Sequence, residues 1–480
     1  KMMNKLFSYS LQNKKLLTSS IEFKLTNPLI DTVYCEDKRK VDLPSLTPWK
    51  PIERPSLSSY SYLQTPELLK KKYLSTRDLQ INIGQLSNFI PNKQLNTYQD
   101  ILDYIHENNQ NNSNYSKHIY VIDSSEDDFG SRANFGRGHI HEEFNKGCLT
   151  SYEIFFKRLC NTAVNSLNSQ FGNDIRILGT IHSPDLTERC WNKSPNDVNE
   201  RNILKEAVKT HHDRLSSVIS TVYQSHQQKS KSSNTTTYPR VYLVNGDHNH
   251  MLSAIQGVTD GLSTYTNDYT NNNQDNNIIT PIVIYIDLHA DSRPIEDGPH
   301  SGTWCSEAHA NGWIEQAYCI GLNPLGNSQL TIDNLDASGT IYQKYTWTEI
   351  KSKNITMKKI GKEIVQDIQQ KFGENHPIIL SICGDTVLQL PSSAGTNTIG
   401  YSSDEIYEVI SILIKRLNVT CFTIAELKTS LNPNLQSNVG EFLTQCLFLY
   451  HQHNTNKSEK ERKRNKSKSN YNLKEKYQVN

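Results

Sequence analysis

The chain is short of the features that mark membrane, disulfide-rich and nucleic-acid-binding proteins. Its 480 residues contain no apolar run near the roughly 20 residues needed to cross a bilayer. Lys and Arg total 51 against 50 Asp and Glu, so a net charge of +1 gives no general reason to expect a nucleic-acid or membrane partner. Only 35% of the residues are hydrophobic. Part of the length is therefore expected to join no core.

The nine cysteines are odd in number, scattered, and mostly placed inside apolar segments. This use of cysteine indicates a reducing compartment rather than a disulfide framework. The first 21 residues contain lysines, serines and leucines but no acidic residue, a composition that resembles an organelle transit segment. A disordered amino-terminal arm explains the same composition. A cytoplasmic protein is therefore the first expectation, and a mitochondrial one stays open.

Strand-like and helix-like runs alternate along the middle of the chain. The predicted strands are His118–Asp123, Ile175–Ile181, Val241–Val244, Pro281–Ile286, Ala317–Leu322, Pro377–Ile382 and Val419–Ile424. Such alternation predicts an α/β fold of three αβα layers, in which a mainly parallel sheet is covered by helices on both faces.

The clearest helix pattern covers Ser402–Leu417. Ser402 and Glu405 form a capping box at its start, and an apolar stripe at helical spacing follows. Other helical patterns cover Tyr98–Glu107, Ser151–Leu167 and Lys358–Phe372.

Composition divides the chain into an arm, a domain and a tail. Residues 1–117 are expected to form an extended, partly disordered arm, and residues 118–453 the α/β domain. Polar tracts near 225–237 and 266–277 interrupt the domain. We expect both to be surface loops, because they cannot bury enough apolar surface to offset the entropy of ordering. Residues 454–480 are basic and are expected to be a disordered tail, with a nuclear-import or RNA-binding segment as the alternative.

Metal-capable side chains follow four of the predicted strands. Asp287, His289 and Asp291 come directly after Pro281–Ile286, at alternate positions that would point the same way on an extended backbone. Such groups are costly to leave unpaired at a buried strand end, and one or two divalent cations would satisfy all three. The other candidates are His248, Cys383, Asp385 and Glu426. Ligand sites in parallel sheets lie beyond the carboxyl ends of the strands, where these residues fall.

Four motifs, in this order, resemble the ureohydrolase family of arginase, agmatinase and formimidoylglutamase. They are NGDHNH at 245–250, IDLHAD at 286–291, SICGDTVLQLPSSAGTNTIG at 381–400 and FTIAEL at 422–427. Two further runs resemble the formimidoylglutamase-like branch, namely EDDFGSRANFGRG at 126–138 and HSGTW at 300–304. The resemblance covers residues 120–452 and implies an arginase-like fold and a homo-oligomer, a trimer or hexamer.

The resemblance also implies a centre of two manganese ions. His248 would bind the first ion and His289 the second, with Asp287 bridging both. Asp291 would complete the first position and Asp385 the second. Carboxylates with a few imidazoles suit hard or borderline ions such as Mn²⁺. A single ion, or a different divalent ion, stays open.

The implied reaction is hydrolysis of a C–N bond in a small linear amidine or guanidine substrate. A hydroxide shared by the metals would attack the amidine carbon, and collapse of the tetrahedral intermediate would release formamide or urea. Glu426 would orient the cationic group of the substrate. Cys305 lies in the segment where arginases carry a proton-shuttling histidine, and His300 and His309 are nearby candidates for that role.

Cys383 departs from the family pattern. The third motif of the family offers Asp-x-Asp, whose first Asp bridges the metals, and Cys383 stands at that position. A thiolate favours zinc, copper or iron–sulfur chemistry over manganese, whereas a neutral thiol would cost each metal one ligand. Cys383 could also be a small buried residue beside the site. A catalytically silent relative that binds a ligand or a partner is therefore the second hypothesis.

Several candidates also have a structural explanation. The carboxylates and imidazole of IDLHAD could form a buried ionic network without a metal. Glu426 could be an ordinary carboxylate at a strand end. Arg132, Asn134 and Arg137 could clamp a substrate carboxylate or brace the loop after the first strand.

Overall fold

The structure is a computed structural model that describes most of the α/β part of the chain. The described ranges are 98–110, 118–125, 128–135, 151–163, 169–181, 183–190, 192–230, 238–267, 279–392, 399–427 and 434–452, together with Ile83, Leu95 and three short strands nearer the amino terminus. Over these ranges no helix has both the length and the apolar character of a membrane span.

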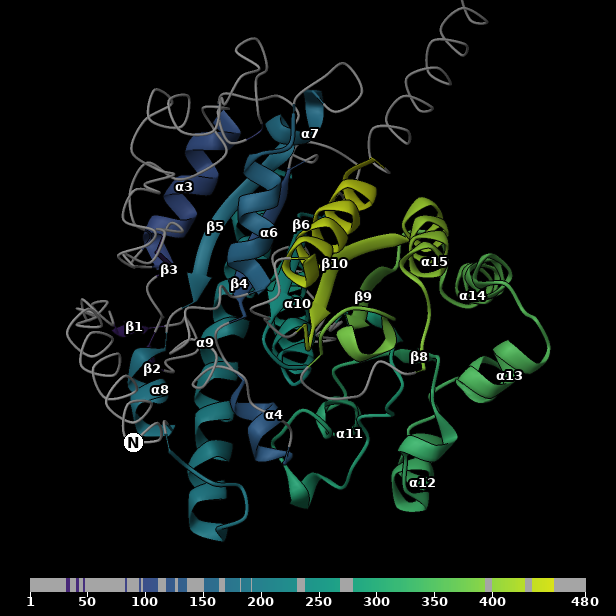
Figure 1. Cartoon of the computed structure of the whole chain (residues 1–480). Coiled ribbons are helices and arrows are strands. Elements are labelled where there is room, and N and C mark those ends of the chain that lie inside the picture. The colour runs from purple at the N-terminus through teal and green to yellow at the C-terminus, as the bar shows by residue number, and fades with distance from the viewer. Residues whose placement is uncertain are drawn as a thin grey trace, which may run out of the picture.

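An eight-stranded sheet lies at the centre of the described part (Figure 1). Its spatial order is β3 (Leu46–Thr47), β5 (Ile175–Ile181), β4 (Ile119–Ser124), β6 (Arg240–Asn245), β10 (Asn418–Ala425), β9 (Pro377–Cys383), β7 (Ile282–Ile286) and β8 (Gln316–Ile320). All pairings from β5 to β8 are parallel, and β3 pairs antiparallel with β5 at one edge. A separate antiparallel ribbon joins β1 (Thr32–Tyr34) and β2 (Lys40–Asp42). The predicted mainly parallel sheet is confirmed.

The central strands are apolar on both faces, as buried parallel strands must be. In β7, Ile282, Ile284 and Ile286 pack into one core, while Val283 and Tyr285 pack into the core on the opposite face. Because the strands are continuous apolar runs, they could be predicted from the sequence.

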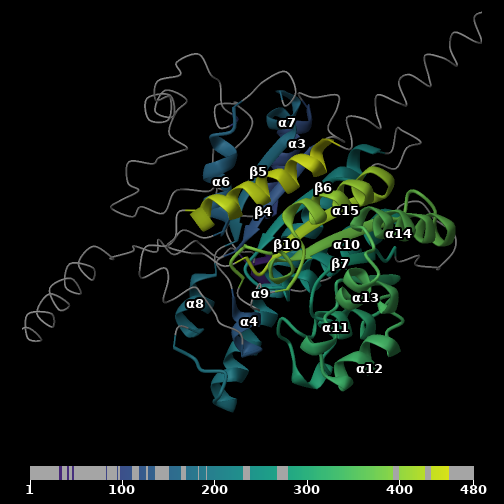
Figure 2. The same cartoon turned by 45° about the vertical axis from the view of Figure 1, so that its right-hand side comes forward.

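Helices cover both faces of the sheet, so the predicted three layers are confirmed (Figures 1 and 2). One face carries α6 (Ser151–Cys160), α14 (Met357–Phe372), α15 (Ser403–Arg416) and a helix over 434–452. The other face carries α3 (Tyr98–Gln110), α9 (Val198–Ser230), α10 (His250–Asn267) and α11 (Trp304–Ala310). Shorter helices are α4 (Phe129–Ala133), α7 (Ser169–Asp174), α8 (Pro184–Cys190), α12 (Gln329–Ala337) and α13 (Trp347–Ser352), with 3-10 turns η3 (Ile295–Asp297), η4 (Pro324–Gly326), η5 (Gln343–Tyr345) and η6 (Gly384–Thr386).

The predicted capping box of α15 is present. The Glu405 backbone N–H donates to the Ser402 hydroxyl at 3.2 Å, and the Ser402 N–H donates to the Glu405 carboxylate at 2.8 Å. Such a cap stabilises a helix by about 1 kcal/mol. The buried residues of α15 are Ile406, Val409, Ile410, Leu413 and Ile414, which hold it against the sheet.

The structure differs from the sequence prediction at the first polar tract. Helix α9 continues to Ser230, so the beginning of the tract predicted as a loop near 225–237 is helical. The helix packs against α10, and packing of this kind supplies most of the stability of helices in proteins. The rest of that tract, most of the tract near 266–277, and residues 454–480 lie outside the described residues.

Candidate metal centre

The carboxyl ends of β6, β10, β9 and β7 are neighbours in the sheet, and the segments that follow them carry the predicted strand-end candidates. These are His248, Asp287, His289, Asp291, Cys383, Asp385 and Glu426. A cavity of about 600 Å³ opens at this edge, and every one of these residues except Asp385 lines it. The parallel register therefore brings together residues that are far apart in the chain.

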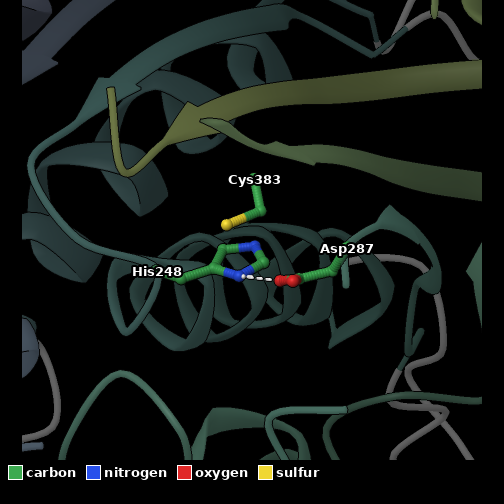
Figure 3. Close-up of side chains that lie close together, drawn as sticks. All are labelled: His248, Asp287 and Cys383. Carbon is green, nitrogen blue, oxygen red and sulfur yellow. Dashed lines mark ion pairs between the residues drawn. The ribbon is translucent and has the colours of Figure 1, made fainter. Parts of the chain in front are cut away.

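The first donor group forms around His248. Its Nδ1 atom lies 2.7 Å from Asp287 Oδ2 and 2.8 Å from Asp291 Oδ2. Its Nε2 atom lies 2.9 Å from the Ser381 hydroxyl, which fixes the ring with Nδ1 toward the carboxylates. The Cys383 sulfur lies close to the same imidazole, across the ring from Asp287 in the view of Figure 3, and donor atoms of His248, Asp287 and Cys383 all lie within 4.8 Å of one another.

The second donor group shares Asp287 with the first. Donor atoms of Asp287, His289 and Asp385 lie within 4.8 Å of one another. His289 Nδ1 is 2.7 Å from Asp385 Oδ2 and 3.6 Å from Asp287 Oδ1. His289 is 34% exposed at the cavity, whereas both carboxylates are buried. One aspartate thus stands between two groups of potential ligands.

The IDLHAD residues converge through a turn and not along an extended strand. Strand β7 ends at Ile286, and the backbone N–H of His289 donates to Asp287 Oδ1 at 2.7 Å. Asp291 has φ +48°, and the Trp304 indole N–H donates to its Oδ2 at 2.8 Å. The expectation of an extended backbone with alternating faces was wrong, because a turn brings these side chains closer together than consecutive same-face positions of a strand can lie.

Buried polar atoms at this edge provide a test of whether a metal fits. Among the residues that the structure describes, His248 Nδ1, Asp287 Oδ2 and both carboxylate oxygens of Asp385 are buried without a hydrogen-bond partner. Leaving a buried carboxylate in that state is costly. Ligand atoms around a cation also lie close together without forming hydrogen bonds to one another. The residues present therefore fit divalent ions.

The pKa shifts in the two donor groups also support binding of divalent ions. Burial lowers the pKa of His248, but the adjacent Asp287 and Asp291 carboxylates outweigh it and raise that pKa well above its usual value. Burial raises the pKa of Asp287, but the two imidazoles outweigh it and lower that pKa. Burial, with the carboxylates of Asp287 and Asp385, raises the pKa of the Cys383 thiol. Without a cation, His248 and Cys383 therefore hold protons, and a bound metal would replace them.

Glu426 follows β10 directly and faces the cavity from a buried position. It has φ +64°, and its Oε1 atom accepts a hydrogen bond of 3.1 Å from the backbone N–H of His248. Gly384 allows the third motif to approach this turn, since a Cβ there would lie 3.0 Å from the Glu426 carbonyl carbon. The carboxylate is thus tied to the first donor group through the backbone.

The structure does not bring His300 to the donor groups. Its Nε2 atom lies 3.0 Å from Asp297 Oδ2, and its Nδ1 atom accepts a hydrogen bond of 3.0 Å from the Gly302 N–H. It is absent from the cavity lining, to which Ser301 and Gly302 contribute. Burial lowers its pKa to about 4. His309 lies 3.4 Å from the Thr340 hydroxyl and does not line the cavity.

The segment after β4, which includes helix α4, contains a residue that braces the fold and another that lines the cavity. Arg132 donates to the backbone carbonyls of Cys190 and Lys193 at 2.8 and 2.9 Å, which favours its structural role. Asn134 lines the cavity and donates to the Ser301 hydroxyl at 3.1 Å. Arg137 lies outside the described residues.

Sequence reasoning missed several residues of this site. Arg293 lines the cavity, and its position two residues after IDLHAD was the signal that could have found it. Ser381 and Trp304 hold His248 and Asp291 in place. Both supports lie in motifs quoted above, at 381–400 and 300–304, but hydroxyl and indole groups are common in buried strands and helices, so neither residue was identified as a support.

Comparison with known proteins places the chain near one family. No family model matches it. The formimidoylglutamase of Geobacillus sp. (strain WCH70) is 22% identical over 176 residues, or 35% of this chain. The match spans about half of that relative, 51% of its length. The chain is similar to the ureohydrolases. The predicted resemblance to the formimidoylglutamase-like branch is confirmed.

Solved structures that are similar to this chain include two bacterial enzymes. The formimidoylglutamase from Bacillus subtilis subsp. subtilis str. 168 has 17% identity and a TM-score of 0.47, over 70% of this chain and 86% of its own. The arginase from Bacillus caldovelox has 17% identity and a TM-score of 0.45, over 69% of this chain and 98% of its own.

Proposed function

We propose that this chain is a metal-dependent hydrolase that cleaves a C–N bond of a small linear amidine or guanidine. One observation carries the proposal: two donor groups share Asp287 at the edge of a cavity formed by four neighbouring strand ends. The similarity to a formimidoylglutamase supports the same class of reaction.

Two divalent ions fit the donor atoms. His248, Asp287 and Asp291 would hold the first ion, and Asp287, His289 and Asp385 the second, with manganese as the ion that the resemblance implies. Bound ions of this kind supply a Lewis acid and make water a better nucleophile near neutral pH. Ser381 and Trp304 keep the ligands in place through hydrogen bonds to His248 and Asp291.

Glu426 would orient the substrate in this proposal. Its carboxylate is buried at the cavity surface and would attract the positive amidinium or guanidinium group. A charge-assisted hydrogen bond of this kind is about twice as strong as a neutral one. Its link to the His248 N–H would hold the reacting carbon close to the ions.

The outer wall of the cavity offers polar groups for the other end of the substrate. Ser131, Asn134 and Arg293 line it, and the Arg293 side chain is 45% exposed. Its guanidinium and the Asn134 amide would recognise a carboxylate or another acceptor group. The proposed substrate therefore carries an amidine or guanidine at one end and an acceptor at the other.

The proposal is tested with the purified full-length chain after metal loading. Arginine, agmatine, formimidoylglutamate and smaller guanidines are incubated with it, and release of urea, ammonia and formamide is measured. We expect at least one compound to be hydrolysed, and Asp287→Asn to abolish the reaction. A chain that binds its metals but releases no product from any of them would contradict the proposal.

A second function, in a catalytically silent relative, is favoured by Cys383 alone. Such a protein would bind a guanidine or amidine in the same cavity without turning it over. Calorimetry distinguishes the two, because a silent protein would retain the bound compound unchanged.

A homo-oligomer, implied by the family resemblance, is checked by light scattering of the same sample.

A further inference from the structure

We propose that Cys383 is a thiolate ligand of the first metal position, so that the centre takes two different ions. A softer ion such as zinc would occupy the first position, and a harder ion such as manganese the second. The inference rests on the proposed function for the existence of a two-ion centre, but not for hydrolysis.

The sulfur lies with one donor group only. Cys383 shares its group with His248 and Asp287, whereas the second group contains Asp287, His289 and Asp385 and no sulfur. Figure 3 shows the sulfur and the Asp287 carboxylate both close to the His248 imidazole, approaching it from different strand ends. Cys383 is 2% exposed and is the last residue of β9, so the sheet itself fixes its position.

A second observation points to a ligand at this place. His248 Nδ1 and Asp287 Oδ2 are both buried and have no hydrogen-bond partner, although they lie 2.7 Å apart. Together with Asp291, these two atoms and the Cys383 sulfur would provide the ligands of the first position. The sulfur is therefore part of a site with unsatisfied partners, and not a lone cysteine in a core.

A metal would bind Cys383 as a thiolate, because the deprotonated sulfur is the form that ligates metals. The thiol proton passes to water as the sulfur–metal bond forms.

The donor types then separate the two positions by metal preference. A set of imidazole, thiolate and carboxylate suits zinc or cobalt(II), which accept sulfur, nitrogen and oxygen ligands. A set of two carboxylates and one imidazole suits manganese. The sequence difference at Cys383 would thus alter one half of the centre and leave the other half unchanged.

Cobalt(II) provides a direct test, because cobalt bound to a thiolate has an intense near-ultraviolet charge-transfer band. Metal-free full-length protein is titrated with cobalt(II) and followed by absorption. We expect the band to saturate at about one ion per chain and to be lost in Cys383→Ser. Cys305→Ser is the matched control, because Cys305 is equally buried and belongs to neither donor group. This control should keep the band.

Zinc binding gives a second readout. X-ray absorption of the zinc-loaded chain should show a ligand at about 2.3 Å, the Zn–S distance, beside shorter ligands at about 2.0–2.1 Å. Cys383→Ser should remove the longer distance and weaken zinc binding by about 100-fold or more, because even outer partners of metal ligands are worth about 10- to 100-fold. Manganese added after zinc should then bind at about one ion per chain.

The opposite results would overturn the proposal. They are cobalt bound without the band, a band that persists in Cys383→Ser, or two manganese ions bound equally by the unmodified chain. Cys383→Asp is the second variant, expected to keep the fold by circular dichroism, lose the band and bind about two manganese ions. A chain with the sulfur band but no hydrolysis contradicts only the proposed function, whereas an active two-manganese chain without the band contradicts only this inference.

Discussion

At the scale of single residues, Glu426 offers a separable test of substrate orientation. Glu426→Gln keeps an oxygen that can accept the hydrogen bond from the His248 N–H but removes the negative charge. We expect metal content to stay unchanged and kcat/KM for cationic substrates to fall by about 100-fold, roughly 2.7 kcal/mol of transition-state stabilisation. Steady-state kinetics with elemental analysis checks this, and an equal loss of metal would argue for a ligand role instead.

A buried histidine away from the metal groups predicts how stability depends on pH. Burial lowers the pKa of His211 from its ordinary value of 6.5 to about 3, and its ring nitrogens lie 2.7 and 3.0 Å from the Ser124 and Ser183 hydroxyls. The unfolded chain binds a proton in this window and the folded chain does not. Stability is therefore complete above pH 6.5 and falls as the pH drops toward 3, by up to about 1.4 kcal/mol per unit.

Urea unfolding of the metal-free chain at pH 7.5 and pH 5.5 measures this effect. His211→Gln can still bond to a serine hydroxyl but cannot be protonated in this range. The variant should lose less stability between the two pH values than the unmodified chain does. An identical loss in both proteins would show that other groups carry the pH dependence.

The residues of the site differ in how well the sequence could predict them. Asp287, His289, His248 and Asp385 were recognisable because metal-capable side chains end apolar strands, and parallel strands end at one edge. The turn that brings Asp287 and His289 together was not recognisable, because alternation fits an extended strand equally well. His300 was misplaced because proximity in sequence does not say on which side of a cavity wall a ring lies.

At the scale of elements, the packing of α9 against α10 depends on small residues. A Cβ at Gly261 of α10 would lie 2.5 Å from the Cβ of Tyr223 in α9, and one at Gly257 would lie 2.7 Å from the Ser216 carbonyl oxygen. The two helices therefore approach each other closely at these positions.

Gly261→Ala tests this contact. Overpacking costs about 1–3 kcal/mol, which exceeds the gain of about 1 kcal/mol in helix propensity. We expect a lower free energy of unfolding in urea. Gly361→Ala in α14 is the control, since its added carbon would lie 3.2 Å or more from movable side chains. A stabilised Gly261→Ala protein would contradict the close packing.

Helix α9 also shows which elements could not be predicted from the sequence. The seven parallel strands were predictable, because buried strands are continuous apolar runs. Helix α9 was not, since polar residues such as His211 and Arg214 occupy its buried face. Arg214 is paired there with Asp185, and its two terminal nitrogens donate to the two carboxylate oxygens at 2.8 and 2.7 Å. Because Asp185 is far from Arg214 in sequence, the chain alone does not show that this arginine belongs to the buried face of α9, and the amphipathic pattern of the helix is not apparent.

At the scale of the whole molecule, metal binding should stabilise the fold. An ion that binds only the folded chain adds about 2.7 kcal/mol at a concentration 100 times its dissociation constant. Thermal unfolding with a divalent ion and with chelator should therefore give different midpoints. Asp287→Asn should remove most of the difference, because Asp287 belongs to both donor groups. Equal midpoints for the unmodified chain would exclude tight binding.

The position of β10 has a consequence for the order of events during synthesis. It is the last of the described strands in chain order, yet it lies between β6 and β9 in the middle of the sheet. Until it is made, the half that carries His248 and the half that carries Asp287 have no strand to join them. An emerging chain therefore cannot capture the first ion with its full set of ligands. Binding of the proposed ions by the complete site would therefore require β10 to have joined the two halves of the sheet.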